Sequence, residues 1–151
     1  MIISCVAEVF GYIDNLNHSF NEIEDFGIAL LKFENGSSGI IESSMNIYPE
    51  NFEEKLSIFG EKGSVVQVGK SLNRINHWNV KDNGIIDLKV FSETHDSIYG
   101  NGHDKLFKNL IEAIADNTDP LITLFDGRRT VEVILAIYKS SREERLVKLS
   151  I

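Results

Sequence analysis

The chain has 151 residues, a formal net charge of −8 at pH 7 and a pI near 5.0. This length predicts one domain, and the acidic balance argues against nucleic acid or an anionic membrane surface as a partner, because both require a concentrated basic patch. Cys5 is the single cysteine, which excludes an internal disulfide framework and predicts a protein of the reducing cytoplasm. No apolar run approaches the length of a membrane span, so we expect no membrane partner.

Glycine and asparagine divide the first two thirds of the chain into about seven predicted strands. Tight turns at Asn35-Gly36, at Gly60 to Gly63 and at Asp82 to Gly84 predict three hairpins, and successive hairpins indicate an antiparallel sheet. The predicted strands are Ile3 to Phe10, Asp25 to Phe33, Ser38 to Met45, Lys55 to Phe59, Ser64 to Val68, Leu72 to Val80 and Ile85 to Phe91.

The second predicted strand is apolar on both of its faces. Phe26 and Leu30 point one way, while Ala29 and Leu31 point the other. Two helices can cover only one face of an antiparallel sheet, so the other face needs a cover from another domain or another subunit. We therefore predict a homo-oligomer that assembles through the open face of the sheet with two-fold symmetry.

The last third of the chain predicts two helices and a short strand. Apolar residues from Leu106 to Ile114 recur on one face of the first helix, and Pro120 marks its end. Thr123 and Asp126 have the spacing of a capping box for a second, more buried helix, and the alternation from Leu146 to Leu149 predicts a closing strand. The predicted fold class is α+β: an open, mainly antiparallel sheet of about seven strands plus a closing strand, with the two C-terminal helices on one face.

Several motifs are similar to those of one enzyme family. The strand region contains Phe33-Glu34-Asn35-Gly36, Gly39-Ile40-Ile41-Glu42-Ser43-Ser44 and Ile58-Phe59-Gly60-Glu61-Lys62-Gly63-Ser64. The helical region contains Ile111-Glu112-Ala113-Ile114, Pro120, Asp126-Gly127-Arg128-Arg129 and Ala136-Ile137-Tyr138-Lys139-Ser140. In this order, nearly the whole chain resembles the C-terminal domain of the glucose–fructose oxidoreductase, inositol dehydrogenase and rhizopine-catabolism (Gfo/Idh/MocA) family.

The resemblance implies a two-domain oxidoreductase that uses NAD or NADP and acts on a sugar, nucleotide-sugar or cyclitol. It implies that residues 1–151 form a single C-terminal domain for substrate binding and oligomerisation, and that the family's N-terminal Rossmann domain is absent from this chain. We therefore carry over no catalytic and no cofactor-binding residue, and we expect no hydride transfer by this chain alone. The alternative is a stand-alone, non-catalytic α+β module that binds a ligand or dimerises.

Six residues are candidates for contact with a sugar-like substrate: His18, Glu42, Asn46, Trp78, Tyr99 and His103. His18 lies in a loop rich in Asn and Ser, which hydrogen-bond sugar hydroxyls, although a plain surface loop is the simpler interpretation. The ring of Trp78 suits stacking on a sugar, but packing in a core or an interface explains it more simply.

The other four candidates rest on strand parity or on the resemblance. Glu42 and Asn46 share one face of a strand, where they either line a polar pocket or face water. The resemblance places Tyr99 and His103 in a loop near the active-site cleft. The four histidines of the chain lack the close spacing that brings two imidazoles to one metal ion, so we predict no metal site.

Overall fold

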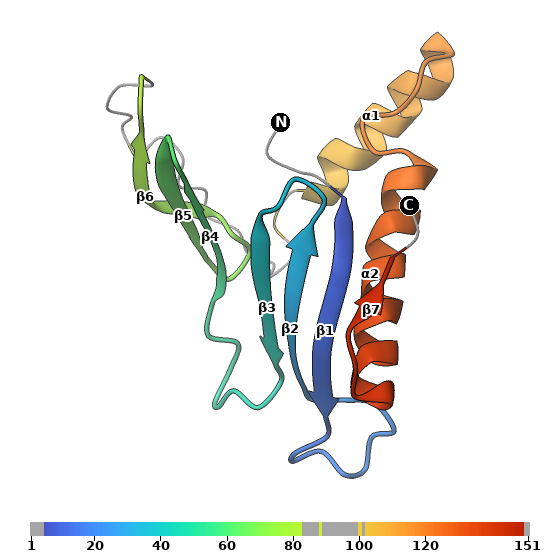
Figure 1. Cartoon of the computed structure of the whole chain (residues 1–151). Coiled ribbons are helices and arrows are strands. Elements are labelled where there is room, and N and C mark those ends of the chain that lie inside the picture. The colour runs from blue at the N-terminus through green and yellow to red at the C-terminus, as the bar shows by residue number, and fades with distance from the viewer. Residues whose placement is uncertain (1–4, 83–87, 89–99, 101, 150–151) are drawn as a thin grey trace. The chain divides into compact units, whose positions relative to one another are not determined.

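A computed structural model describes residues 5–82, 88, 100 and 102–149 of the chain (Figure 1). The chain divides into two compact units, and each is described by itself. The first unit comprises residues 1–47 and 122–151, and the second comprises residues 48–121.

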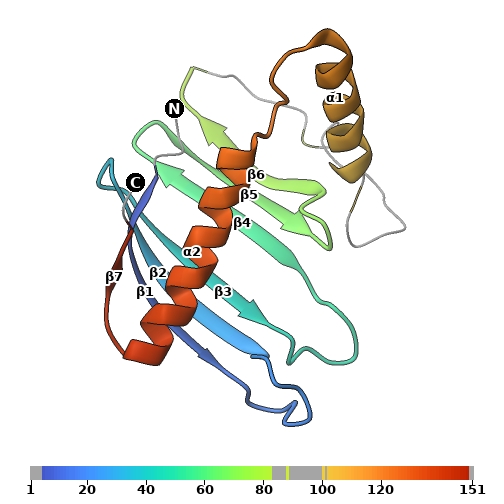
Figure 2. The ribbon, with the colours of Figure 1, turned by 90° about the vertical axis from the view of Figure 1, so that its right-hand side faces the viewer.

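The first unit is a four-stranded antiparallel sheet with one helix. Its strands are β1 (Val6–Asp14), β2 (Phe26–Phe33), β3 (Ser38–Ser44) and β7 (Val147–Lys148), in the order β3-β2-β1-β7. Helix α2 (Leu124–Glu143) lies across one face of this sheet (Figure 2). The core between helix and sheet consists of Val9, Ala29, Leu31, Ala136 and Val147.

Small residues allow α2 to lie very close to β1. A Cβ atom on Gly11 would stand 2.8 Å from Cγ2 of Ile137, and the backbone N–H of Gly11 donates to Oγ of Ser140 over 2.9 Å. That hydroxyl, which is 0% exposed, in turn donates to the carbonyl of Arg145 over 2.6 Å. The chain then turns back at Glu144, whose φ is +52°, and enters β7.

The second unit contains a three-stranded antiparallel sheet and one helix. The strands are β4 (Glu54–Gly60), β5 (Gly63–Gly69) and β6 (Arg74–Val80), in the order β4-β5-β6, and the helix is α1 (Gly102–Asp116). Gly63 has a φ of +152°, and a Cβ there would stand 2.2 Å from the carbonyl oxygen of Asn79. The tight β4–β5 turn therefore requires glycine.

The predicted α+β class, the antiparallel pairing and the two helices are confirmed, although the described strands form two sheets where one was expected. The Asn35-Gly36 hairpin forms, with positive φ at Gly36 but not at Asn35, because the loop is longer than two residues. The predicted capping box is present. Thr123 Oγ1 accepts from the N–H of Asp126, and the N–H of Thr123 donates to the carboxylate of Asp126.

Most predicted strand boundaries differ from the observed ones by one residue, and two are displaced further. The first strand was expected to end at Phe10, but it runs to Asp14 because Gly11 pairs with Ala29 in the ladder. The sixth begins at Arg74 and not at Leu72, whose φ of +53° places it in a turn. The predicted hairpin at Asp82 to Gly84 and the strand from Ile85 to Phe91 lie outside the described residues.

Candidate functional site

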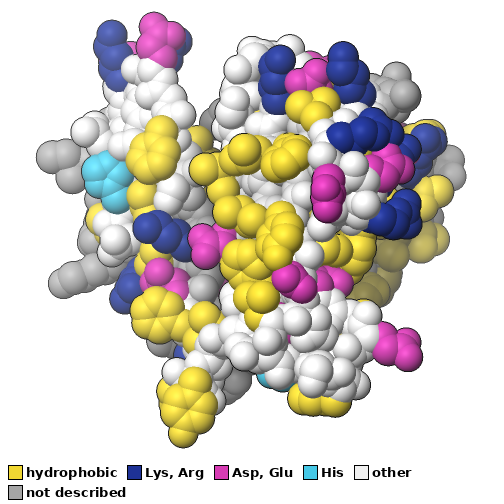
Figure 3. All heavy atoms as spheres, turned by 60° about the horizontal axis from the view of Figure 1, so that its bottom comes forward, with side chains coloured by type: hydrophobic (Ala, Val, Ile, Leu, Met, Phe, Trp, Pro, Cys, Tyr) yellow, Lys and Arg dark blue, Asp and Glu magenta, His cyan; other side chains and the backbone are white. Residues whose placement is uncertain are grey.

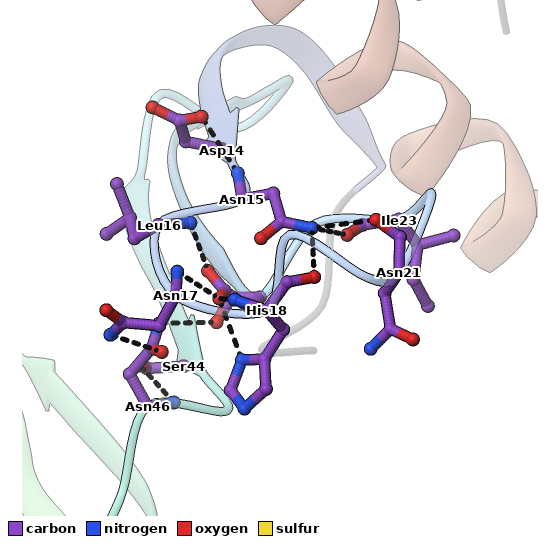
Figure 4. A network of polar contacts seen from close by, with 10 residues as sticks. Asp14, Asn15, Leu16, Asn17, His18, Asn21, Ile23, Ser44 and Asn46 are labelled. Atoms are coloured by element: carbon purple, nitrogen blue, oxygen red, sulfur yellow. Dashed lines mark hydrogen bonds and ion pairs between the residues drawn. The ribbon is translucent and has the colours of Figure 1, made fainter.

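The loop between β1 and β2, residues 15–25, is built around one buried carboxylate (Figure 4). Asp25 is 3% exposed. Its Oδ1 accepts from the backbone N–H of Leu16 over 2.8 Å, and its Oδ2 accepts from those of Asn17 and His18 over 2.8 and 3.0 Å. The same Oδ2 lies 2.9 Å from Nδ1 of His18. One side chain thus holds four groups of the loop.

The hydrogen bonds to Asp25 keep it ionised. Burial by itself would raise the pKa of this carboxyl, because a charge is poorly solvated in the protein interior. Hydrogen bonds from the amides of Leu16 and Asn17 and from the side chains of Asn46 and His18 lower it, and together they outweigh burial. The pKa of Asp25 therefore lies well below its ordinary value.

Two asparagines complete the framework of the β1–β2 loop. The side-chain amide of Asn15 donates to the carbonyls of His18, Asn21 and Ile23 over 2.9 to 3.0 Å. Beyond the end of β3, Asn46 accepts from the side chain of Asn17 over 2.8 Å and donates to the carbonyl of Asp25. The loop is thus fastened internally and to the neighbouring strand end, which favours a single conformation.

His18 presents one ring nitrogen from this fixed loop. Because the ionised Asp25 can only accept, Nδ1 of the neutral imidazole carries the proton and Nε2 has a free lone pair. The side chain is 33% exposed, and its ring and that of Phe20 lie nearly perpendicular, with the ring centroids 5.7 Å apart. This arrangement suits acceptance of a hydrogen bond from a ligand hydroxyl.

The structure brings together two of the six predicted site residues, His18 and Asn46. The side chain of Asn46 bonds to Asn17 and to the carbonyl of Asp25, so its observed contacts are structural. Glu42 is exposed on the face of the sheet away from α2. Trp78 and His103 belong to the second unit, where Trp78 is half-buried on β6 and His103 is exposed at the start of α1. Tyr99 lies outside the described residues.

Sequence reasoning missed Asp25, the residue that organises the loop. Its position directly before an apolar strand and after a run of Asn, His and Ser was the available signal, because Asp side chains commonly bind the amides of an adjoining turn. That signal alone could not show which amides the carboxylate would meet.

The face of the first unit's sheet away from α2, here called the open face, carries a second candidate site. Cross-strand register places Phe10 beside Leu30 and Ile40, and Tyr12 beside Ile28. These five large hydrophobic side chains are 38% to 72% exposed. A contiguous exposed apolar patch of this kind is typical of a protein interface.

The opposite side of the same sheet contains a hollow of about 250 Å³ beside α2. Its walls are mainly apolar and include Ile13, Ile41, Met45 and Ile134. The hydroxyl of Tyr138 donates to Glu24 at its margin, and this bond raises the pKa of Tyr138. Figure 3, which looks onto the end of the sheet that bears the β1–β2 loop, shows hydrophobic side chains gathered near the middle of the view.

The described residues contain no dinucleotide fingerprint of the Rossmann type. A dinucleotide fingerprint requires parallel strands joined by a helix after a glycine-rich turn, and every described strand pair is antiparallel. Among the same residues, no cluster of three or more His, Cys, Asp or Glu side chains could hold a metal ion. Neither described helix has the length and apolar character needed to cross a membrane.

Comparison with known proteins identifies the family of the chain. The model of the C-terminal α/β domain of an oxidoreductase family, Gfo/Idh/MocA, matches residues 4–149. The chain belongs to this family. No match was found among the curated proteins.

Solved structures agree with the Gfo/Idh/MocA assignment. The WlbA dehydrogenase from Bordetella pertussis, crystallised with NADH and UDP-GlcNAcA, is 30% identical with a TM-score of 0.88 over 97% of this chain and 43% of that one. The WlbA dehydrogenase from Chromobacterium violaceum, with the same ligands, is 30% identical with a TM-score of 0.84 over 99% of this chain and 41% of that one. An oxidoreductase domain protein from Kribbella flavida, 19% identical over 97% of this chain and 45% of that one, shares the fold with a TM-score of 0.74.

Proposed function

We propose that this chain is the substrate-side, oligomerising domain of an NAD(P)-dependent dehydrogenase that acts on a sugar, nucleotide-sugar or cyclitol. The observation that carries the proposal is the 30% identity, over nearly the whole chain, to an enzyme crystallised with NADH and UDP-GlcNAcA. A nucleotide sugar is the substrate class that this likeness favours. The chain's own contribution is a wall of the substrate pocket and a surface for assembly.

Cofactor binding and hydride transfer belong, in this proposal, to a Rossmann domain outside the 151 residues. The chain spans about two fifths of the length of the WlbA dehydrogenases it matches, so those enzymes contain a larger part with no counterpart here. The antiparallel sheets of the described residues lack the parallel βαβ unit on which a Rossmann-type dinucleotide site is built. NAD or NADP would therefore bind to the complete enzyme, and no step of the reaction is assigned to residues of this chain.

His18 is the substrate contact that the described geometry favours among the six candidates. Its Nε2 accepts a hydrogen bond from a sugar hydroxyl, while Asp25 fixes the tautomer and the orientation of the ring. Because four groups of the loop are already bound to Asp25, the ring is held before substrate arrives, and little entropy is lost on binding. Glu42, Trp78, Tyr99 and His103 remain candidates for further contacts.

The coding sequence upstream of Met1 tests the dehydrogenase assignment at once. A glycine-rich βαβ region followed by a Glu-Lys-Pro motif would support it, whereas an unrelated domain would support the stand-alone module. The direct measurement is formation of NADH, followed by its absorbance, when the complete polypeptide receives NAD⁺ and a panel of UDP-sugars, free sugars and cyclitols. No turnover of any of them with either nicotinamide cofactor would overturn the proposal.

Substitution of His18 tests its assigned contact. His18→Ala in the complete enzyme should lower kcat/KM for the sugar substrate about tenfold, because a single hydrogen bond to the substrate is lost. The affinity for NADH should stay unchanged. His77→Ala, which removes an exposed imidazole of the second unit, is the matched control and should leave both values unaltered. An unchanged kcat/KM in His18→Ala would remove His18 from the substrate pocket.

The open face supports the assembly part of the proposal. Burial of its five large hydrophobic side chains against a second copy would remove them from water, and two-fold symmetry lets one self-complementary patch serve both copies. Leu30→Glu should therefore convert the oligomer to a monomer in analytical ultracentrifugation. Leu135→Glu, at a similarly exposed leucine on α2, should not. A wild-type chain that sediments as a monomer at all concentrations would exclude this interface.

A further inference from the structure

Helix α2 contacts the β1–β2 loop at both of its ends. At the start of the loop, Oγ of Ser141 accepts from the backbone N–H of Ile13 over 3.0 Å. At its end, the hydroxyl of Tyr138 donates to the carboxylate of Glu24. Tyr138 and Ser141 are three residues apart on α2, so they lie on the same side of the helix. Two neighbouring side chains of one helix therefore hold both ends of one loop.

The two contacts lie at the base of the network that holds His18. Tyr138 binds Glu24, and the next residue in the chain is Asp25. The carboxylate of Asp25 binds the ring of His18 over 2.9 Å, and its backbone N–H donates to the carbonyl of Asp14 over 3.0 Å. A movement of Glu24 away from α2 would therefore displace the residue that orients the ring.

The sheet alone does not hold the start of the loop. The short strand β7 pairs with β1 near the beginning of β1, so the outward N–H of Ile13 meets no described strand. Ser141 supplies the missing acceptor, as Ser140 does for Gly11 one step earlier along the same edge. Close packing against Gly11 fixes α2 on the sheet. The helix is therefore a rigid support from which Ser141 and Tyr138 reach the loop.

We propose that Tyr138 and Ser141 are positioning residues that hold both ends of the β1–β2 loop on α2 and thereby keep the ring of His18 in one orientation. The inference rests on the proposed contact of His18 with substrate and adds the residues on which that contact depends. Tyr138 is 39% exposed, so water can replace its hydroxyl at Glu24. Removal of the hydroxyl should therefore loosen the loop without unfolding the unit.

Hydrogen–deuterium exchange of the complete protein, resolved to single amides by mass spectrometry, measures how firmly the loop is held. The amides that report on the loop are the three that donate to Asp25, those of Leu16, Asn17 and His18. Tyr138→Phe keeps the ring and removes the hydroxyl, so it should lower the protection of these amides about fivefold, the effect of losing one hydrogen bond. Ser141→Ala should have an effect of similar size.

Two controls separate a local hold on the loop from general destabilisation. Thr130→Ala removes another hydroxyl of α2, which donates to the carbonyl of Asp126 within the helix, and should leave the protection of the loop unchanged. The amides of the β1–β2 ladder should keep their protection in Tyr138→Phe and Ser141→Ala. Unchanged loop protection in both variants would overturn the proposal. An equal loss of protection in ladder and loop would do the same, because it would show general destabilisation.

Steady-state kinetics of the complete enzyme connect the hold on the loop to His18. The probe is the UDP-sugar, free sugar or cyclitol with the highest turnover. Tyr138→Phe should raise its KM about threefold and leave kcat unchanged, because the ring is less often in place before binding. In His18→Ala the same substitution should have no further effect, since the ring through which it acts is absent. An unchanged KM, or an equal rise in both backgrounds, would contradict positioning of His18.

The two measurements keep the proposed function and the positioning role apart. A His18→Ala enzyme with unchanged kinetics would overturn the substrate contact itself. The exchange measurement contains no substrate, so it decides separately whether Tyr138 and Ser141 hold the loop. Failure of the substrate contact and failure of the hold are therefore distinct results.

Discussion

The two faces of the first unit's sheet are built from the same strands but differ in exposure. Towards α2 stand Val9, Gly11, Ala29 and Leu31, which are buried. On the open face, Phe10 and Leu30 are large and about half exposed. Alternation along a strand therefore encodes two separate contacts: close packing within the chain on one side, and a surface for another molecule on the other.

The difference shows where stability and assembly are determined. On the covered face, contacts of α2 with Gly11 tolerate little added volume because the helix already lies against the backbone. On the open face of an isolated chain, a larger or smaller side chain is exposed to solvent and contacts no part of the core. Substitutions on the covered face should change the free energy of unfolding, whereas those on the open face should change association.

The most damaging expected change is Gly11→Val on the covered face. Its Cβ would meet Ile137 at a distance that no real contact allows and would force α2 away from β1. We expect a loss of about 3 kcal/mol in the free energy of unfolding, measured by urea denaturation followed by circular dichroism. Gly127→Ala, at a position on α2 with open space around it, should instead stabilise the chain by about 1 kcal/mol. A stable Gly11→Val protein would contradict the close approach of α2.

Ser140→Ala should have the next largest effect. It leaves the buried N–H of Gly11 without its acceptor and the carbonyl of Arg145 without its donor. The expected cost is about 2 kcal/mol in the free energy of unfolding. Ser37→Ala, which removes an exposed hydroxyl bound only to Asn35, should change the same quantity by less than about 0.5 kcal/mol. Equal costs for the two serines would mean that burial of Ser140 contributes nothing.

Much of the fold was predictable because it depends on local signals. Asn35-Gly36 marked a hairpin, Thr123 and Asp126 marked a helix start, and both are confirmed. Gly11 was misread as the end of a strand, since nothing in the neighbouring sequence shows that a helix more than a hundred residues later needs the space. The division of the strands into two sheets likewise depends on contacts between distant segments.

The candidate site was less predictable than the fold. Sequence could single out a polar loop and His18, because residue type alone suggests what a side chain can bind. It could not show that Asp25 turns towards that loop, or that Asn46 is committed to its framework. Those facts depend on where two strand ends meet. A polar side chain at such a position can form its hydrogen bonds with the protein or with water, and residue type does not distinguish the two.

Asp25→Asn should destabilise the first unit less than the changes beneath α2, with a fall of about 3 °C in Tm at pH 7. The pKa of Asp25 is depressed in the folded chain, so its stabilising contribution is present above the ordinary carboxyl pKa and is lost as the pH falls through the folded value. Wild type should therefore lose stability below about pH 4, and the variant should lose less over the same range. Parallel pH profiles of Tm would contradict the assigned network.

The smallest expected effect on the folding of a single chain is that of Ile40→Thr, which keeps a β-branched side chain at a position 72% exposed on the open face. At low protein concentration, its free energy of unfolding should match that of wild type within about 0.5 kcal/mol. At high concentration the two should diverge, because association stabilises only the folded wild-type chain by mass action. Thermal unfolding across a range of concentrations measures both quantities. A wild-type Tm that did not rise with concentration would contradict association through the open face.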